Sequence, residues 1–161
     1  MQNIKDSQIC VVCGLMSGAF LCNNHRKRYI IYPKHNFVAL KPRRRISKAQ
    51  SGILREVKEV FRSPSFQEAI FPFMMFYRMD IVIPEYKLCV EYDSELHFKF
   101  IKHFHKTKAN FKHRQKLDDV KAGVVEDNGW TVLRINYKEK NVKGKLKWMK
   151  NKIKKKRRLS K

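Results

Sequence analysis

Acidic residues are scarce in this chain of 161 amino acids. It contains 14 Asp and Glu against 37 Lys and Arg, which gives a formal net charge of +23 at pH 7. An excess of this size favours a polyanionic partner, and nucleic acid is the first candidate. A membrane surface is the second candidate, but we find no amphipathic helix with a large apolar face to support it.

Long hydrophobic runs are also missing. The longest apolar run, residues 69–77, is far shorter than the about 20 residues of a spanning helix, and it contains Pro72. The opening sequence MQNIKDSQIC lacks the charged and apolar regions of a signal peptide. We therefore expect an intracellular protein with no membrane partner, in the cytoplasm of a bacterial host if the gene belongs to a phage. Because 43% of the residues are hydrophobic, the chain can bury a core and is not a disordered basic protein.

Cysteine is rare, and its distribution excludes a secreted disulfide framework. Three of the four cysteines lie in the segment CVVCGLMSGAFLCNNH, and Cys89 stands alone in an expected strand. The spacing CxxC, eight residues and CxxH predicts a structural Zn²⁺ knuckle over residues 1–30, with the ligands Cys10, Cys13, Cys22 and His25. Two alternatives remain open: His35 replaces His25, or the residues are surface thiols and a solvated histidine.

The remaining pattern predicts an α/β fold. A basic linker over residues 31–46 precedes a helix over 48–62, which Ser47 caps. Three strands, a loop, a helix and a strand follow, near residues 69–75, 77–83, 87–93, 94–111, 112–127 and 130–137. The segment 138–161 holds thirteen Lys and Arg and one acid around a thin apolar seam. We expect it to be a basic helix on DNA, with a disordered tail as the alternative.

The stretch YRMDIVIPEYKLCVEYDSELHF concentrates carboxylates in expected β-strands. A hairpin with a four-residue turn at 84–87 places Asp80 opposite Glu91, and alternation puts Glu91 and Asp93 on one face. Clustered carboxylates repel one another unless a cation lies among them. Hard oxygen ligands favour Mg²⁺ or Mn²⁺, but a salt bridge to Lys87 or Arg78 would compensate the charge equally well.

Two further pieces favour the metal. His97 lies four residues after Asp93, where an imidazole could transfer a proton. Asp118 and Lys121 are three residues apart on the expected helix and so share a face.

With these pieces, RMDIVIPEYKLCVEYDSELHF and LDDVKAGVVEDNGWTVLRINY resemble the PD-(D/E)xK nuclease superfamily. The branch they are most similar to is that of the very-short-patch-repair-like enzymes, which includes phage homing endonucleases with an EDxHD motif. The resemblance covers about residues 47–137 and implies a restriction-endonuclease-like mixed sheet flanked by helices. One departure is Ser94, which stands where the family usually has Gly.

The resemblance implies a role for each matching residue. Asp80 would be the central Mg²⁺ ligand, assisted by Glu91 or Asp118. His97 would be the general acid or base, and Lys121 would stabilise the phosphorane. The second motif element also includes Asp93. The leading Glu of the motif would be Glu56, with Glu59 and Glu68 as alternatives.

The expected function is a metal-dependent endonuclease that hydrolyses double-stranded DNA, of homing or mismatch-directed type and without a small-molecule cofactor. The rival is a non-catalytic, basic, zinc-containing nucleic-acid-binding protein, such as a ribosomal or DNA-packaging component. The charge and the cysteine motif suit both. The acidic cluster separates them, since a pure binding protein gains nothing from carboxylates where phosphate must approach.

Overall fold

The computed structural model describes residues 10, 12–13, 21–41, 47–74 and 77–159, apart from the side chain of His25. The helices and strands in these residues are α1 (Asn23–Arg26), β1 (Tyr29–Tyr32), β2 (Phe37–Leu40), α2 (Lys48–Phe61), β3 (Phe66–Ala69), β4 (Met79–Ile83), β5 (Leu88–Asp93), α3 (Lys102–His105), α4 (Lys108–Asp127), β6 (Thr131–Asn136) and α5 (Val142–Leu159). Short 3₁₀ turns lie at Pro33–His35, Pro72–Met74, Pro84–Tyr86 and Glu95–His97.

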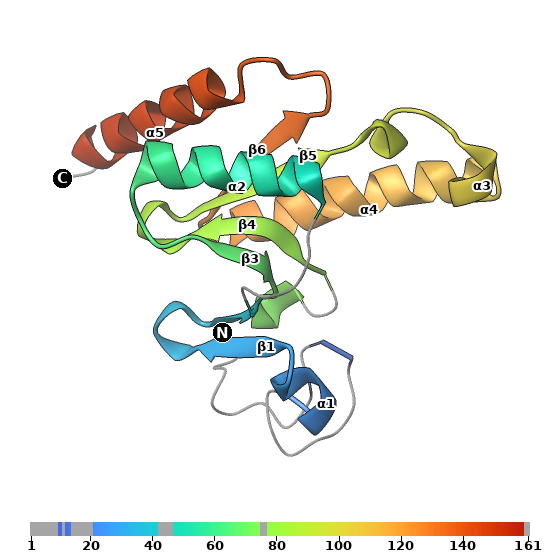
Figure 1. Cartoon of the computed structure of the whole chain (residues 1–161), viewed down its shortest axis with the longest axis horizontal. Helices are drawn as coiled ribbons and strands as arrows, with labels where there is room; N and C mark the ends of the chain where they lie inside the picture. Colours follow the sequence, from blue (N-terminus) through green and yellow to red (C-terminus); the bar gives the residue numbers. More distant parts are fainter. Residues whose placement is uncertain (1–9, 11, 14–20, 42–46, 75–76, 160–161) are drawn as a thin grey trace.

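Four strands form a mixed sheet in the order β3–β4–β5–β6. The first three pair antiparallel, and β6 lies parallel to β5. The two-stranded sheet of β1 and β2 continues this sheet beyond β3, because Val38 and Ile70 exchange two backbone hydrogen bonds of 3.1 and 2.8 Å. Figure 1 shows the β1–β2 unit below the larger sheet. The predicted α/β class and mixed sheet are confirmed.

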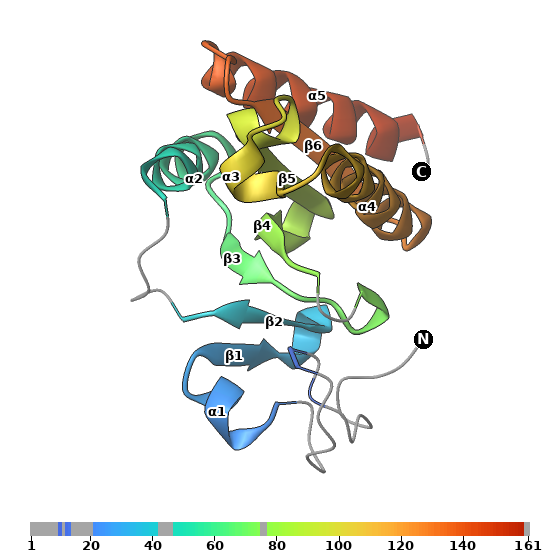
Figure 2. The ribbon, with the colours of Figure 1, turned by 90° about the vertical axis from the view of Figure 1, so that its right-hand side faces the viewer.

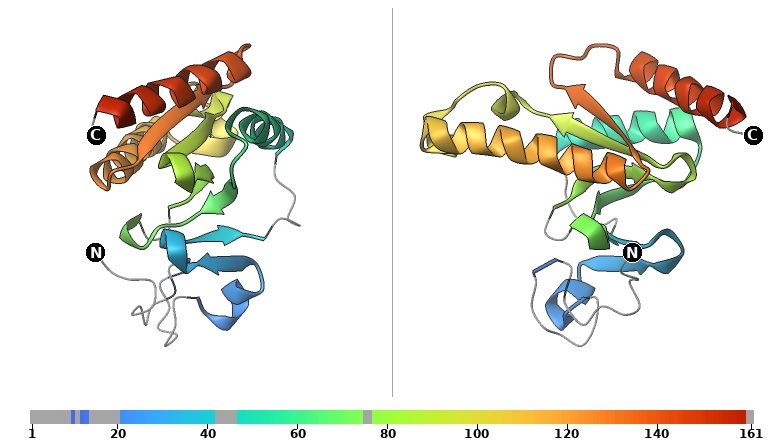
Figure 3. Two further views of the ribbon diagram at one scale, coloured as in Figure 1. Left: turned by 90° about the vertical axis from the view of Figure 1, so that its left-hand side faces the viewer. Right: turned by 180° about the vertical axis from the view of Figure 1, so that it is seen from behind.

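Helices cover both faces of the larger sheet. Figures 2 and 3 show α2 and α5 on one face and α4 on the other. Alternation along β5 fits these layers, since Leu88 and Val90 join the cluster with α2 and α5, whereas Cys89 joins the cluster with Val125 of α4. The same alternation turns Glu91 and Asp93 toward α4. Within the described ranges, no helix is long and apolar enough to cross a membrane.

The hairpin of β4 and β5 has the predicted register. Its Cα partners are Ile81 with Val90, Val82 with Cys89 and Ile83 with Leu88. Pro84 opens the turn, and Lys87 closes it in the left-handed conformation with φ 45°. The β1–β2 hairpin repeats this turn, from Pro33 to Asn36 at φ 52°. The turn at residues 84–87 therefore sets the register that brings Asp80 next to Glu91, and a turn of the same kind joins β1 to β2.

Three expected segments differ from the structure. The basic linker expected at 31–46 contains the end of β1, a 3₁₀ turn and all of β2, and β1 and β2 pair as an antiparallel hairpin. The strand expected at 69–75 ends at Ala69, and a 3₁₀ turn begins at Pro72, which fixes φ and has no N–H for a sheet. The expected loop at 94–111 contains α3 and the first residues of α4. Helix α4 starts at Lys108 because Thr107 is its N-cap, and the Thr107 hydroxyl accepts a 3.1 Å hydrogen bond from the Asn110 N–H.

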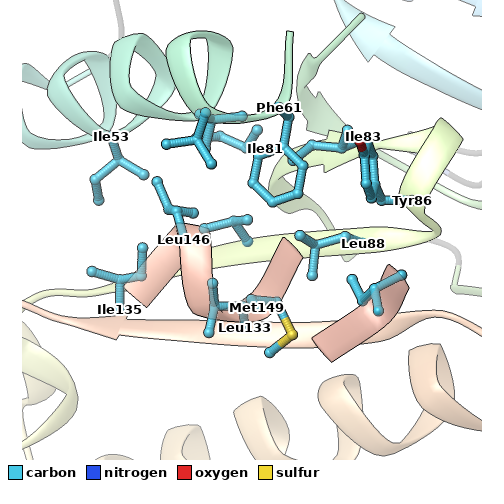
Figure 4. Packing of buried hydrophobic residues seen from close by; sticks show 14 residues of the cluster. Ile53, Phe61, Ile81, Ile83, Tyr86, Leu88, Leu133, Ile135, Leu146 and Met149 are labelled. Carbon is cyan, nitrogen blue, oxygen red and sulfur yellow. The ribbon is translucent and has the colours of Figure 1, made fainter. Parts of the chain in front are cut away.

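The basic C-terminal segment is a helix that packs on the core, so the disordered-tail alternative is wrong for residues 142–159. Leu146, Met149 and Ile153 are buried in the same cluster as Ile53 and Phe61 of α2. Figure 4 shows Leu146 and Met149 meeting Ile53 and Phe61 between the two helices and the sheet. The apolar seam that the sequence shows is therefore a core contact. Lysines and arginines form most of the remaining helix surface, and Trp148 and Leu159 are exposed among them.

Candidate functional site

Asp80 lies half-buried on β4 and is held by two hydrogen bonds. Its Oδ1 accepts from Gln50 Nε2 of α2 at 2.8 Å, and its Oδ2 accepts from the backbone N–H of Tyr92 at 2.8 Å. Burial raises the pKa of this carboxyl, and the nearby charge of Glu68 adds to the rise, while the Tyr92 N–H and the charge of Lys121 oppose it. Both oxygens thus have partners inside the chain.

Glu91 on β5 pairs with Lys121 on α4. Lys121 Nζ lies 2.6 Å from Glu91 Oε2, and these side chains are 14% and 16% exposed. Glu91 Oε1 also accepts from the backbone N–H of Asp80 at 2.8 Å, which links the two strands where the sheet ladder stops. Burial raises the pKa of Glu91 to about 7, since it outweighs the attraction of Lys121.

His97 forms a pair with Asp118 of α4. Its Nδ1 lies 2.8 Å from Asp118 Oδ2 and 3.9 Å from Asp93 Oδ1. Gln115 Nε2 donates to the His97 carbonyl at 2.9 Å and fixes the turn that carries the ring. The bond to Asp118 raises the pKa of His97. Burial by itself would raise the pKa of Asp118, but the bond to His97 and the surrounding positive charges together lower it.

Asp93 is committed to a salt bridge with Arg134 of β6. The guanidinium donates from Nε and Nη2 to the two carboxylate oxygens at 2.8 and 2.9 Å. Such a two-point pair is geometrically specific and strong, and Asp93 is buried. Arg134 was not a predicted site residue. The feature of the sequence that could have indicated Arg134 is its position in the strand TVLRIN, because the parallel register of β5 and β6 places it beside Glu91.

These side chains line one small cavity between the sheet and α4. Its volume is about 10 Å³, close to the smallest space that holds one water molecule. Five of the seven predicted catalytic residues line it, together with Arg134: Glu91, Asp93, His97, Asp118 and Lys121. Asp80 is linked to this group through the Glu91 carboxylate. Glu91 and Asp93, which the alternation of β5 was predicted to place on one face, thus both line the cavity, whereas Asp80 does not.

Glu56 is not the residue of α2 that contacts the site. Gln50, six residues nearer the start of the helix, meets Asp80 instead. Glu56 Oε2 is buried without a hydrogen-bond partner in the described part of the chain, and its charge acts on Lys143 of α5. Six residues are about 9 Å along a helix axis, so one helix cannot present both residues to Asp80.

The two alternatives to Glu56 also have partners of their own. Glu59 pairs with Lys143 at 2.6 Å, and Glu68 pairs with Arg78 at 3.3 Å. Of these two, Glu68 is the residue whose charge reaches Asp80. The feature of the sequence that could have drawn attention to Gln50 is its position three residues after the N-cap Ser47. There the two residues form a capping box at the start of α2.

The predicted Mg²⁺ or Mn²⁺ ligand set does not fit one ion in this arrangement. Asp80, Glu91 and Asp118 do not bring their oxygens within 4.8 Å of one another; among the described residues, such a group of three or more forms at the cysteines instead. Each carboxylate has a separate partner: Gln50 and Tyr92, Lys121, and His97 respectively. Compensation within the chain was one expectation, but Lys121 and Arg134 supply it rather than Lys87 or Arg78.

The cysteine cluster fits a soft metal ion such as zinc. The sulfur atoms of Cys10, Cys13 and Cys22 all lie within 4.8 Å of one another, and those of Cys13 and Cys22 are 3.9 Å apart. Three such thiolates suit a tetrahedral Zn²⁺ site. Burial of Cys10 opposes ionisation, but backbone hydrogen bonds from Cys22, Val12 and Cys13 lower its pKa overall.

The fourth ligand was predicted to be His25 or His35. The side chain of His25 lies outside the described part of the structure. His35 is not in the cysteine group, because its ring stacks on Phe37 at 5.9 Å and lies 6.0 Å from Phe66. The His35 alternative is therefore wrong for this conformation.

Comparisons with known proteins give one partial likeness. No family model matches the chain, and no solved structure matches it. A segment of 64 residues is 39% identical to uncharacterized protein 307L of Invertebrate iridescent virus 6, and it covers 40% of this chain and 32% of that protein. The matched segment thus spans about a third of the viral relative.

Proposed function

We propose that this chain is a DNA endonuclease that hydrolyses phosphodiester bonds. The observation that carries the proposal is the convergence of the His97–Asp118 and Glu91–Lys121 pairs on one cavity. The net charge of +23 supplies the attraction for a nucleic acid. The mixed sheet with helices on both faces supports the resemblance to the PD-(D/E)xK nucleases, since that resemblance implies the same layers.

His97 is the general acid or base of this proposal. Asp118 holds Nδ1, which orients the ring and leaves Nε2 for a water molecule or a leaving oxygen. The side chain of His97 is 32% exposed, so solvent reaches the imidazole ring. The raised pKa keeps a protonated fraction near neutral pH, which suits proton donation to the leaving 3′-oxygen.

Lys121 and Arg134 are the groups that would meet developing negative charge. Both cations line the cavity beside His97, and fixed cations stabilise a phosphorane more strongly in a partly dry site than in water. The family resemblance implies a divalent metal that would supply further charge stabilisation. Because the predicted ligands do not converge here, we assign the roles of His97, Lys121 and Arg134 without it.

A second candidate is the non-catalytic nucleic-acid-binding protein. One observation favours it: each carboxylate of the candidate site already has a partner in the chain. A cluster compensated in this way is stable without substrate or metal, and the cysteine cluster suits a structural zinc in either case.

Incubation with supercoiled plasmid separates the two candidates. We expect the wild type to give nicked or linear DNA and His97→Ala to cleave about 10²-fold more slowly. Parallel reactions with Mg²⁺, Mn²⁺ or EDTA show whether cleavage needs the metal that the resemblance implies. His103→Ala is the matched control, because His103 is an exposed histidine on the nearby helix α3. If the folded wild-type protein binds the plasmid and cuts it under none of these conditions, the binding-protein candidate stands.

A further inference from the structure

A concave surface between α2 and α5 lies on the opposite face of the sheet from the candidate site. It has a volume of about 720 Å³, and residues from the end of α2 and one side of α5 line it. Its cations are Arg62, Lys143, Lys147, Lys150 and Lys154, and its one carboxylate belongs to Glu59. We call this surface the α2–α5 groove.

Helical spacing aligns the four lysines of the groove. They stand at intervals of four, three and four residues on α5, which places them on one stripe of a helix. From Lys143 to Lys154 the stripe runs about 16 Å along the axis. That length equals the rise of about five nucleotides along one strand of a DNA duplex.

The cations of the groove differ in how they are compensated. Lys143 pairs with Glu59 at 2.6 Å. Lys150 donates to the Val60 carbonyl at 2.6 Å, at the end of α2. Arg62, Lys147 and Lys154 have no ion-pair partner in the parts of the chain that the structure describes, and all three are exposed.

Like charges in the groove act on one another. Burial lowers the pKa of Lys150 first, and the charges of Lys154 and Arg62 lower it further. Mutual repulsion of this kind costs stability in the free protein. A polyanion laid along the stripe would relieve it and would release its own condensed counterions.

We propose that the α2–α5 groove binds the phosphate backbone of a nucleic acid, as a site separate from the candidate cavity beside α4. This inference rests on the proposed function for the identity of the polyanion as a nucleic acid, but binding in the groove does not require that the protein cleaves it. Arg62, Lys147 and Lys154 would contact phosphates directly. Lys150 would hold the end of α2 and so shape the groove. A backbone bound on this face would anchor the protein while the opposite face meets another part of the nucleic acid.

Binding to a fluorescent 20-base-pair duplex of arbitrary sequence, in EDTA and over a range of salt concentrations, tests the groove. The test variant is Lys147→Gln/Lys154→Gln. The control is Lys152→Gln/Lys155→Gln, which removes the same charge from exposed residues of α5 that do not line the groove. Each lost phosphate contact lowers the slope of log affinity against log salt by about 0.9.

We expect the test variant to bind about tenfold more weakly than wild type at 0.2 M salt, with a slope lower by about two. The control should keep both values near those of wild type. Equal losses in the two variants would mean that net charge alone matters and would overturn the groove, as would no loss in the test variant. A loss of binding to anionic vesicles but not to the duplex would also overturn it.

Cleavage distinguishes this inference from the proposed function. If the wild type never cuts plasmid, the endonuclease proposal fails while the duplex measurement still decides the groove. If the test variant cuts normally at saturating protein but binds weakly at high salt, the groove and the candidate site are separate, as proposed.

Discussion

At the scale of single residues, burial decides what the candidate site can do. Glu91 and Lys121 are mostly buried side chains that face each other across 2.6 Å. Removing one partner of a buried ion pair leaves the other charge without compensation, which typically costs several kcal/mol. The pair therefore ties α4 to the sheet, whatever chemistry the site performs.

Lys121→Met should lower the free energy of unfolding by about 3 kcal/mol at pH 8.5, where Glu91, with its pKa of about 7, is charged in the wild type. Chemical denaturation measures the change. Lys99→Met is the control, because Lys99 pairs with Glu95 at the same 2.6 Å while these side chains are 60% and 46% exposed. Exposed pairs contribute little, so the control should not change stability. Equal losses in both variants would refute the buried-pair explanation.

The His97–Asp118 pair makes stability depend on pH in a defined window. The pKa of His97 is raised above 6.5, so the stabilisation from His97 is complete below pH 6.5 and is lost as pH rises through the raised pKa. The pKa of Asp118 is lowered below 3.8, so its stabilisation is present above pH 3.8 and is lost as pH falls through the lowered pKa. The pair stabilises the fold most between these values.

His97→Ala should therefore reduce the free energy of unfolding by about 1 kcal/mol near pH 5.5, a figure already reduced for solvent screening. The reduction should shrink above neutral pH. Urea titrations of the wild type, His97→Ala and the control His103→Ala across pH 4.5–8.5 give the comparison. If the difference in the free energy of unfolding between the wild type and His97→Ala stays constant over this pH range, the variant loses stability through packing and not through the charge pair.

At the scale of elements, α5 is both a core helix and a basic surface. Leu146 is fully buried against α2 and the sheet, while Leu159 near the end of the same helix is 81% exposed. Lys147, Lys150 and Lys152 lie between the buried residues. The helix therefore contributes to the fold and to the charge of the molecule at once, and truncation after Tyr137 would remove both.

Leu146→Ala should lower the free energy of unfolding by about 2–5 kcal/mol, because it deletes buried methyl groups and leaves a cavity. Leu159→Ala makes the same chemical change on the same helix and should cost almost nothing. Thermal and urea unfolding of the two variants measure the contrast. If Leu146→Ala unfolds like the wild type, α5 does not pack on the core in solution.

The sequence predicted the elements better than their partners. The four-residue turn at Pro84 fixes the register, and alternation then places Glu91 and Asp93 toward α4. Short-range rules do not reveal that Arg134 would pair with Asp93, since 41 residues separate them in the chain and the parallel crossover of α4 brings them together. The choice of Glu56 failed for a similar reason, because the crossing of α2 over β4 decides which residue meets Asp80.

At the scale of the whole molecule, β2 joins two parts of the chain. Val38 and Leu40 pack in the cluster that contains Cys10, whereas Phe37 and Ala39 pack with Ala69, Phe71 and other residues of the larger sheet. The backbone bonds between Val38 and Ile70 continue this connection. A change at the cysteine cluster can therefore reach β3, while the core between α2 and α5 is a separate cluster.

Zinc binding should stabilise this N-terminal part selectively. Purified protein should carry about one zinc per chain, lost in Cys13→Ala and retained in Cys89→Ala, since Cys89 lies outside the cysteine cluster. On chelation, hydrogen exchange should speed up in β1 and β2 and at Ile70, because the three thiols no longer hold the segment around Cys10. The amides of β5 and β6 should keep their protection, because they belong to the sheet that α2, α4 and α5 enclose. Uniform loss of protection along the chain would mean that the cysteine cluster supports the whole fold, and no change at all would mean that it binds no metal.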